Sequence, residues 1–350
     1  MAVKYKIELY IFRRNNMKQF KGYTKGINLG GWLSQCRHSS SHYESFITEK
    51  DIADIAAMGL DHVRLPMDYE AIEDENGSPL SEGYSYIDKC AEWCEAHGLN
   101  LVLDLHKTAG FVFDDAQSST LFSSHENMQR FLQLWNRLSA RYGSNPRIAF
   151  ELLNEVVEDD PEKWNDLIAQ AIRVIRRNAP ETCIIIGGIQ WNSVHTLKLL
   201  RKPADKNIVF NFHFYEPFLF THQCAPWQPT IPKLIMNYPS DIREYRNRSQ
   251  QINCFGSVLY NVDKMGAGFM RALISEAVEA AENAGVPLYC GEYGVDWYAP
   301  ARDTLEWFRD IHSVFEEYGI GRAAWTYKGM DFGLIELHYR SVINELTKLL

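Results

Sequence analysis

Two glutamates stand at the ends of apolar runs in the sequence. A run at 148–153 leads into Asn154 and Glu155, and a run at 287–291 leads into Glu292. Each run is typical of a buried strand, and a glutamate beside a core is costly unless it has a partner or a task. A pair of carboxylates can cleave a glycosidic bond, because one group protonates the leaving oxygen while the other acts on the oxocarbenium-like transition state. We therefore take Glu155 and Glu292 as the candidate catalytic pair.

Other polar or aromatic residues end most of the remaining apolar runs. The further candidates are Asn28, Arg64, His106, His213, Tyr215 and Trp325. Arg64 and the Tyr215 hydroxyl are suited to stabilising an ionised Glu292. Asn154 can hydrogen-bond a sugar 2-hydroxyl, a contact that strengthens in the transition state. The two histidines can orient the carboxylates or bind sugar hydroxyls, and the tryptophan offers a flat apolar face to a pyranose ring.

Three of these candidates also have a purely structural interpretation. Arg64 can be an ion-pair partner, His106 beside Asp104 can be a satisfied core histidine, and Trp325 can be ordinary packing. The residue types leave these alternatives open. A catalytic or substrate-binding role is favoured because all the candidates fall at the same end of the predicted strands.

The elements that must position these residues alternate regularly along the chain. The predicted strands are residues 26–30, 61–66, 100–106, 147–155, 183–189, 207–215, 287–295 and 321–328. The predicted helices are residues 48–59, 83–98, 124–143, 161–180, 193–200, 266–285, 301–319 and 341–350. Thr48 and Asp51 form a capping-box pattern and Gly59 supplies a stop. Pro161 opens its helix, as helix starts prefer.

Eight strands, each followed by a helix or a helix-containing segment, predict an α/β fold. The strands are nearly continuous apolar runs, as expected when both faces of a parallel sheet are covered. We expect a closed (β/α)8 TIM barrel with a long insertion at 216–265 after strand six. The rival is a doubly wound open sheet, but the glycine-rich run at 26–31 lacks the G-x-G-x-x-G spacing of that fold. In a barrel the candidate residues share the C-terminal face, where active sites form.

The length and net charge of the chain limit the number of domains and the classes of partner to expect. The chain has 350 residues, and we expect one catalytic domain at 18–350 after an N-terminal extension at 1–17, with Met17 as an alternative start. The net charge of −9 argues against nucleic acid and anionic membranes as partners. No stretch is long and apolar enough to span a membrane. No surface stripe argues for an oligomer, so we expect a monomer.

The cysteines and the N-terminus bear on the compartment. Seven cysteines are scattered without a CxxC pair or a zinc-type cluster, and Cys90 and Cys94 share one helix face. We expect reduced core thiols, which are typical of a reducing compartment. The apolar patch at 7–12 is shorter than a signal-peptide core and is broken by Glu8. A cytoplasmic location is therefore favoured, or secretion if the true N-terminus is missing.

Seven short motifs together resemble a known enzyme family. They are Gly26-Ile27-Asn28-Leu29-Gly30-Gly31-Trp32, Val63-Arg64-Leu65-Pro66, Asp104-Leu105-His106, Leu153-Asn154-Glu155, His213-Phe214-Tyr215, Gly291-Glu292-Tyr293-Gly294 and Ala324-Trp325. In type and order they resemble glycoside hydrolase family 5, in particular its compact single-domain bacterial cellulases. The resemblance extends from Lys25 to about Asp331.

The resemblance implies a TIM barrel of the retaining clan without a metal or another cofactor. Glu155 matches the acid/base position and Glu292 the nucleophile position. Arg64, His106, Asn154, His213, Tyr215 and Trp325 match the rest of the family's active-site pattern. One departure is the run 108–110, Thr-Ala-Gly, where similar enzymes often carry Pro-Gly. That loop borders the substrate cleft in the family, so the resemblance does not define the shape of the subsite there.

The expected function is double-displacement hydrolysis of a β-glucan, with the two carboxyl groups about 5–5.5 Å apart. The substrate is a β-1,4-glucan cut internally or a mixed-linkage β-1,3-1,4-glucan. The alternatives within the family are β-mannanase, xyloglucanase and exo-β-1,3-glucanase. The insertion bears on this choice through aromatic residues that either stack on sugars or pack the insertion, namely Phe218, Phe220, Trp227, Tyr238 and Tyr245.

Two alternatives come from other classes. A metal-dependent barrel hydrolase or isomerase would use the ligand-type residues Asp104, His106, Glu155, His213 and Glu292, which suit zinc or manganese. Against it, no H-x-H motif lies on the first strand. A non-catalytic carbohydrate-binding barrel would be expected to have lost one carboxylate, and both are present.

Overall fold

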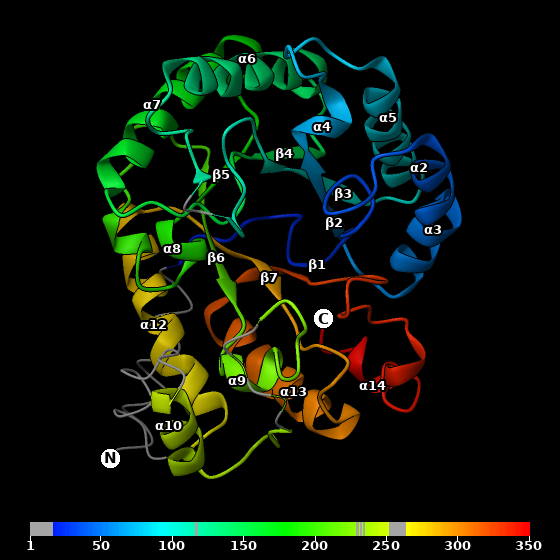
Figure 1. Cartoon of the computed structure of the whole chain (residues 1–350), viewed down its shortest axis with the longest axis vertical. Helices are drawn as coiled ribbons and strands as arrows, with labels where there is room; N and C mark the ends of the chain where they lie inside the picture. The colour runs from blue at the N-terminus through cyan, green and yellow to red at the C-terminus, as the bar shows by residue number, and fades with distance from the viewer. Residues whose placement is uncertain (1–16, 116–117, 229–230, 232, 234, 252–263) are drawn as a thin grey trace.

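Eight parallel strands form a closed barrel at the centre of the molecule (Figure 1). The computed structural model describes residues 17–115, 118–228, 231, 233, 235–251 and 264–350. Each strand pairs with the next in the chain, and the first pairs with the last. The strands are β1 (Lys25–Asn28), β2 (His62–Asp68), β3 (Asn100–Lys107), β4 (Ile148–Glu151), β5 (Ile184–Gly187), β6 (Ile208–Phe214), β7 (Leu288–Tyr293) and β8 (Gly321–Ala324). The predicted (β/α)8 barrel is confirmed.

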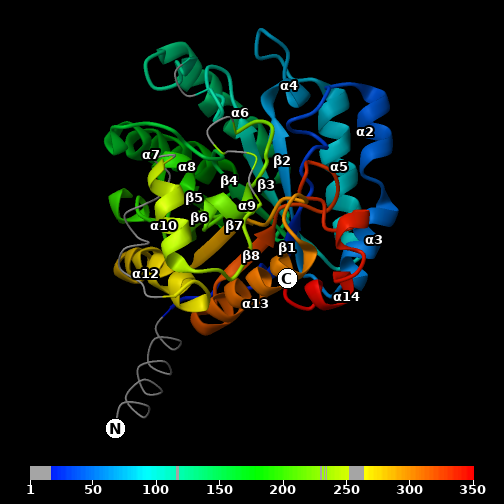
Figure 2. The same ribbon diagram turned by 60° about the horizontal axis from the view of Figure 1, so that its bottom comes forward.

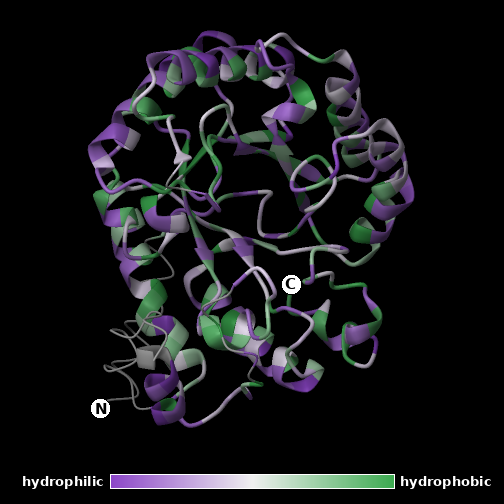
Figure 3. Cartoon of the chain, viewed as in Figure 1, coloured by the Kyte–Doolittle hydropathy of each residue, from purple (hydrophilic) through white to green (hydrophobic). Residues whose placement is uncertain are grey.

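Helices surround the barrel in both views (Figures 1 and 2). The longer ones are α3 (Glu49–Ala57), α5 (Ser81–Ala96), α6 (His125–Tyr142), α7 (Pro161–Asn178), α10 (Ile242–Gln251), α12 (Ala267–Ala284) and α13 (Ala301–Tyr318). The shorter ones are α2 (Ser40–Phe46), α4 (Tyr69–Ile72), α8 (Ile189–Asn192), η2 (Leu197–Leu199), α9 (Phe218–Thr221), η3 (Leu337–Tyr339) and α14 (Ile343–Leu346). Figure 3 shows hydrophilic and hydrophobic residues on the same outer helices, the pattern of amphipathic helices packed on a core.

The interior of the barrel changes from apolar to polar along its axis. At the N-terminal end of the strands, a separate apolar cluster fills the interior, made of Phe20, Tyr23, Val102, Ala149, Ile185, Val209, Tyr289 and Ala323. Side chains two residues further along a strand point to the same face. On β3 this step leads from Val102 to Asp104 and His106, and on β4 from Ala149 to Glu151. Period-two alternation therefore places a buried polar layer on top of the apolar one.

Local signals set several helix ends as predicted. The Thr48 backbone N–H donates to Asp51 Oδ2 at 2.8 Å, which confirms the capping box at the start of α3. Pro161 is the first residue of α7, and the Asp160 side chain caps it. Gly285 ends α12 in the left-handed conformation with φ 72°, as the missing Cβ allows.

Four predictions about elements are wrong. Strand eight was expected to reach Lys328 but ends at Ala324. Strand four was expected to reach Glu155 but ends at Glu151. The expected helix at 193–200 is only the 3-10 turn η2, preceded by a tight left-handed turn in α8. The expected closing helix at 341–350 is reduced to α14, because the chain bends so that the Leu350 carbonyl accepts a hydrogen bond from Arg322 at 2.9 Å. At the C-terminus a tertiary contact therefore outweighs local propensity.

The remaining predictions concern the insertion, the terminus and the thiols. The insertion carries α9 and α10, while its residues 229–230, 232, 234 and 252–263 lie outside the described residues. Residues 1–16 of the predicted extension also lie outside them, and Met17 packs in the core. The six described cysteines, among them Cys90 and Cys94, form no disulfide. Over the described ranges, no helix has the length and apolar composition needed to cross a membrane.

Candidate active site

The nine residues predicted to form a site lie together at the C-terminal end of the barrel. Five belong to strands, namely Asn28, Arg64, His106, His213 and Glu292. Four follow the ends of strands, namely Asn154, Glu155, Tyr215 and Trp325. Hydrogen bonds, one ring stack and the 3.6 Å approach of His213 Nδ1 to Glu292 Oε2 link all nine into one network.

Arg64 is the centre of this network and is fully buried. Its Nη1 donates to Glu292 Oε1 at 2.7 Å and to Asn28 Oδ1 at 2.9 Å. Its Nε and Nη2 donate to the two oxygens of Glu151 at 2.8 and 2.9 Å. Its Nη2 also reaches Asn154 Oδ1 at 2.9 Å. Burial lowers the pKa of Arg64, but the charges of the surrounding carboxylates outweigh burial and hold that pKa well above its ordinary value. Arg64 is thus both the ion-pair partner and the stabiliser that the sequence left as alternatives.

More carboxyl groups than cations are buried around Arg64. Asp104 Oδ2 lies 2.9 Å from Nη2 of Arg64, so this guanidinium faces three carboxyl groups, and Glu155 is close by. Desolvation raises the pKa of Asp104 to about 7 and that of Glu155 to about 7. Desolvation also raises the pKa of Glu151. One positive charge cannot balance four carboxylates in a buried site, so some of them retain protons near neutral pH.

Both oxygens of Glu292 are held by donors. Arg64 binds Oε1, and the Tyr215 hydroxyl donates to Oε2 at 3.0 Å. The register of β6 against β7 shifts here, since Phe212 pairs with Cys290 but His213 pairs with Glu292. Gly291 is therefore an extra residue in β7, a bulge that turns Glu292 toward the interior. These two hydrogen bonds fix the orientation of the Glu292 carboxyl group.

Glu155 stands in a left-handed conformation with φ 45°, past the end of β4. Its Oε1 lies 2.7 Å from His213 Nδ1. Ligand-type atoms of Glu155, His213 and Glu292 all lie within 4.8 Å of one another. The two glutamates therefore face each other across a short gap.

His106 and Trp325 form one wall of the site. The two rings stack with centroids 5.7 Å apart and an interplanar angle of 4°. His106 Nδ1 lies 2.7 Å from Asp104 Oδ2, and its Nε2 lies 3.5 Å from Asn154 Nδ2. Trp325 is 7 % exposed, so its ring is mostly covered by packing. Both structural interpretations considered for these residues hold alongside their position in the site.

Some residues of the site were not predicted. Glu151 receives two hydrogen bonds from Arg64 and a third, at 2.8 Å, from Asn211 Nδ2. A signal existed, because Glu151 is two residues beyond Ala149 and pairs in register with Asp104. Asn192 was also missed, and its Nδ2 lies 3.2 Å from His213 Nε2. Its position depends on a left-handed turn that no sequence pattern announced.

The aromatic residues of the insertion divide into two groups. Phe220, Tyr238 and Tyr245 are at most 2 % exposed and pack the insertion. Phe218 stacks on His222, with ring centroids 4.1 Å apart. Trp227 is 45 % exposed. The other exposed aromatics of the described residues also follow strand ends on this face: Trp191, Trp297 and Tyr298.

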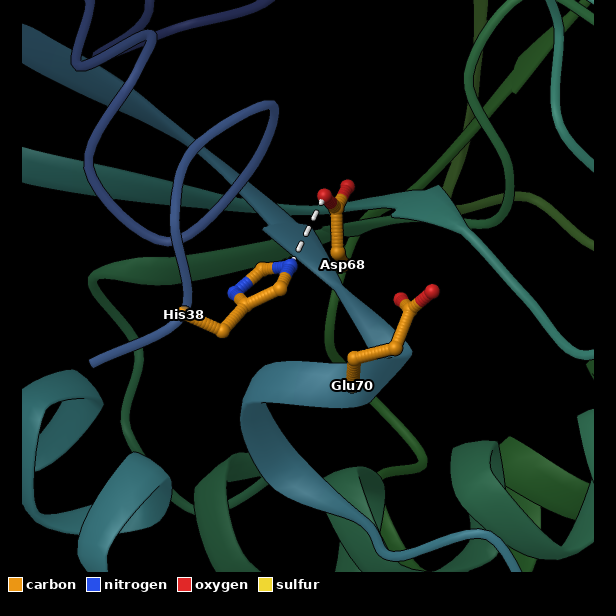
Figure 4. Close-up of side chains that lie close together, drawn as sticks. All are labelled: His38, Asp68 and Glu70. Carbon is orange, nitrogen blue, oxygen red and sulfur yellow. Dashed lines mark ion pairs between the residues drawn. The ribbon is translucent and has the colours of Figure 1, made fainter.

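Two groups of described residues have ligand-type atoms spaced for a metal ion. The first is Glu155, His213 and Glu292, so Asp104 and His106 of the five-ligand hypothesis are not part of it. The second is His38, Asp68 and Glu70, contributed by the segment after β1, the end of β2 and α4 (Figure 4).

In the second group, the oxygens of Asp68 already have hydrogen-bond and ion-pair partners within the protein. Asp68 accepts hydrogen bonds from Ser34 Oγ at 2.6 Å and from the Gln35 N–H at 2.8 Å, and Lys107 Nζ lies 3.5 Å away. His38 Nε2 is 3.4 Å from Asp68, and that hydrogen bond raises the pKa of His38 to about 10. We interpret this group as an ion-pair network that fixes the segment after β1.

Comparisons with known proteins agree with this geometry. The family model Cellulase (glycosyl hydrolase family 5) matches residues 21–331. Endoglucanase C of Acetivibrio thermocellus is 42 % identical over 334 residues, covering 93 % of this chain and 97 % of that protein. Cellodextrinase A of Ruminococcus flavefaciens is 41 % identical over 309 residues, covering 87 % of this chain and 86 % of that protein. The crystal structure of endoglucanase Cel5A from Thermotoga maritima has the same fold, with a TM-score of 0.72 at 24 % identity, covering 97 % of this chain and 99 % of that one.

Proposed function

The chain belongs to glycosyl hydrolase family 5, and on this basis we propose that it is a retaining β-glucan hydrolase in which Glu155 is the acid/base and Glu292 the nucleophile. The observation that carries this proposal is the spacing of the two carboxylates, which have oxygens within 4.8 Å of each other. Retaining enzymes hold their carboxyl groups about 5–5.5 Å apart, whereas inverting enzymes need about 6.5–9.5 Å to admit a water. The short spacing supports double displacement.

In the first step, a Glu292 oxygen attacks the anomeric carbon. The bond from that carbon to the leaving oxygen breaks, and the proton of Glu155 moves to the leaving oxygen. Arg64 and Tyr215 hold the Glu292 oxygens in position for the attack. The products of this step are a glycosyl ester on Glu292, an ionised Glu155 and the shortened glucan with a free hydroxyl.

In the second step, Glu155 acts as a base. It takes a proton from a water whose oxygen attacks the anomeric carbon, and the bond to Glu292 breaks. Two inversions give net retention. Asn154 contacts Arg64 and His106, and this position supports a role for its amide in bonding the sugar 2-hydroxyl in both steps.

Two observations support the proposed substrate class, namely the names of the relatives and the exposed tryptophans that follow the strand ends. The relatives at 41–42 % identity are an endoglucanase and a cellodextrinase. Exposed rings of Trp191, Trp227 and Trp297 flank the site and suit stacking on pyranose units. We propose internal cleavage of β-1,4-linked glucose chains, with mixed-linkage glucan as a second substrate.

Product profiles test this substrate. We expect carboxymethyl cellulose and barley β-glucan to lose viscosity rapidly while mixed oligosaccharides form, because cleavage of internal bonds shortens the chains quickly. Mannan and β-1,3-glucan should react far more slowly. Release of a single sugar from chain ends, or faster cleavage of mannan, would contradict the proposal in favour of an exo-acting enzyme or a mannanase.

The pH profile tests the role of Glu155. The acid must be protonated in the free enzyme, and its pKa is about 7, so kcat/KM for aryl cellobiosides should fall as the pH rises through about 7. With a dinitrophenyl leaving group, which departs without protonation, this basic limb should weaken. The same limb for both substrates would contradict the acid role of Glu155.

Dialysis against a chelator tests the metal alternative. Both oxygens of Glu292 already accept hydrogen bonds, and the Arg64 guanidinium 2.7 Å away would repel a divalent cation. We therefore expect unchanged kcat/KM after treatment with EDTA. Loss of activity that zinc or manganese restores would favour the metal-dependent class.

A further inference from the structure

A left-handed turn follows β5 and has no part in the mechanism described so far. Gln190, Trp191 and Asn192 have φ values of 55°, 56° and 52°. Left-handed backbone is unfavourable for residues other than glycine, and three in succession need strong support from their surroundings. Such strain often marks a functional position.

The third residue of the turn reaches the site. The Asn192 side chain is completely buried, and its Nδ2 lies 3.2 Å from His213 Nε2. A Cβ on Gly187 would lie 2.2 Å from Asn192 Oδ1, so the glycine at the end of β5 makes room for this amide. The first two residues tie the turn to the segment after Glu155, because the Trp191 N–H bonds the Val156 carbonyl at 3.3 Å and Gln190 Nε2 bonds the Glu158 carbonyl at 3.2 Å.

The surroundings of His213 determine which ring nitrogen carries the proton. Its Nδ1 lies 2.7 Å from Glu155 Oε1 and 3.6 Å from Glu292 Oε2. Desolvation lowers the pKa of His213 to about 4, so the ring is neutral near pH 7. A lone pair on Nδ1 would face the Glu292 carboxylate and would need the Glu155 proton to sit on Oε1, whereas an N–H there is attracted to both oxygens. The proton therefore belongs on Nδ1, and Nε2 is left as an acceptor that needs a donor.

We propose that Asn192 is a positioning residue, which donates its amide N–H to His213 Nε2 and thereby holds His213 as the Nδ1–H tautomer. In that tautomer His213 donates to Glu155 Oε1. The acidic proton of Glu155 then resides on Oε2, the oxygen that delivers it to the leaving group. The inference rests on the proposed acid/base role of Glu155 and adds the group that orients the acid through His213.

The test compares leaving groups in Asn192→Leu, which keeps the size of the side chain and removes the donor. We expect kcat/KM for phenyl β-cellobioside, whose leaving group needs a proton, to fall about 10-fold to 100-fold. For dinitrophenyl β-cellobioside, which departs without a proton, the fall should be less than about 3-fold. KM should change little. Equal losses on both substrates would show a merely structural role and overturn the inference, as would wild-type rates on both.

Two controls separate the possible failures. Asn165→Leu removes another buried amide, one that bonds the Leu199 carbonyl at 2.9 Å outside the barrel, and should leave both rates near wild type. Glu155→Gln removes the acid itself, so it shows how kcat/KM depends on the leaving group when no acid is present. If this variant shows no dependence on the leaving group, the proposed function fails as well. If it shows the dependence and Asn192→Leu does not, only the inference about Asn192 fails.

A spectroscopic measurement on the unmodified enzyme is independent of the folding of any variant. In protein labelled with 15N-histidine, the ring of His213 should show a protonated Nδ1 and an unprotonated Nε2 at pH 7. Asn192→Asp replaces the donor by an acceptor, so it should move the proton to Nε2 or protonate both nitrogens. A charged ring would stabilise ionised Glu155 and shift the basic limb of kcat/KM to lower pH. A protonated Nε2 in the unmodified enzyme would overturn the proposal.

Discussion

Replacing Glu292 by Ala is expected to reduce hydrolysis of β-glucan by about 10⁵-fold to 10⁶-fold, the size of loss seen when a covalent nucleophile is removed from an enzyme. The variant lacks the atom that bonds the anomeric carbon, and it removes the acceptor of the Tyr215 hydroxyl and one of the carboxyl groups bound by Arg64. Initial rates on carboxymethyl cellulose and aryl cellobiosides measure the loss. Glu317→Gln is a matched control, because Glu317 pairs with Arg271 on the outer helices and should be dispensable for activity.

Azide distinguishes the two glutamates in a way that loss of activity cannot. In Glu292→Ala, azide should attack an activated cellobioside in place of the missing carboxylate and give the α-cellobiosyl azide. In Glu155→Ala the nucleophile remains, so azide should attack the glycosyl ester and give the β-azide. The opposite pairing of variant and product would mean that the roles are reversed.

Replacing Arg64 by Met is expected to cost about 3–5 kcal/mol of folding stability and to remove nearly all activity. The change leaves Asp104, Glu151 and Glu292 buried without their cation, and breaking a buried pair from one side has this magnitude. Denaturant unfolding measures the free energy. Arg141→Met is the control, because Arg141 and Asp88 form an exposed pair of the kind that contributes about 0–1 kcal/mol.

The penalty of Arg64→Met should depend on pH with a definite sign. The pKa of Asp104 is about 7 even with Arg64 present, and without the guanidinium the folded-state pKa rises further. The unfolded chain releases this proton near the ordinary pKa of 3.8. Stability relative to the unfolded chain therefore falls as the pH rises from about 4 through 7. Unfolding at pH 5 and pH 8 should show the larger penalty at pH 8, and equal penalties would contradict this account of the buried charges.

Much of the barrel and its site follows from sequence patterns whose physical basis is local. Apolar runs of strand length define eight strands, and polar residues at their ends define one face. Alternation within β3 places Val102, Asp104 and His106 on one side, so the buried polar layer follows from a period of two. Glu151 obeys the same rule, but it lies inside an apolar run rather than at its end, so the pattern of polar strand ends does not include it.

The remainder depends on backbone irregularities that a regular period cannot express. Strict alternation from Tyr289 would turn Glu292 outward, and the bulge at Gly291 reverses this. Glu155 reaches the site through a left-handed residue after β4 has ended. Asn192 reaches His213 from the turn at 190–192. The predicted helix begins only after this turn, at residue 193. These features are determined by long-range hydrogen bonds, such as those between Asn28, Asn211 and the backbone of Gly291.

The most direct test of the mechanism is to trap the covalent intermediate. The probe is 2,4-dinitrophenyl 2-deoxy-2-fluoro-β-cellobioside. Its fluorine slows both steps, while its good leaving group keeps the first step faster than the second, so the intermediate accumulates. We expect the enzyme to lose activity with release of one equivalent of dinitrophenolate, and mass spectrometry of its peptides should place a single fluorocellobiosyl group on Glu292. Turnover without accumulation of labelled enzyme, or a label on Glu155, would contradict the double displacement through Glu292.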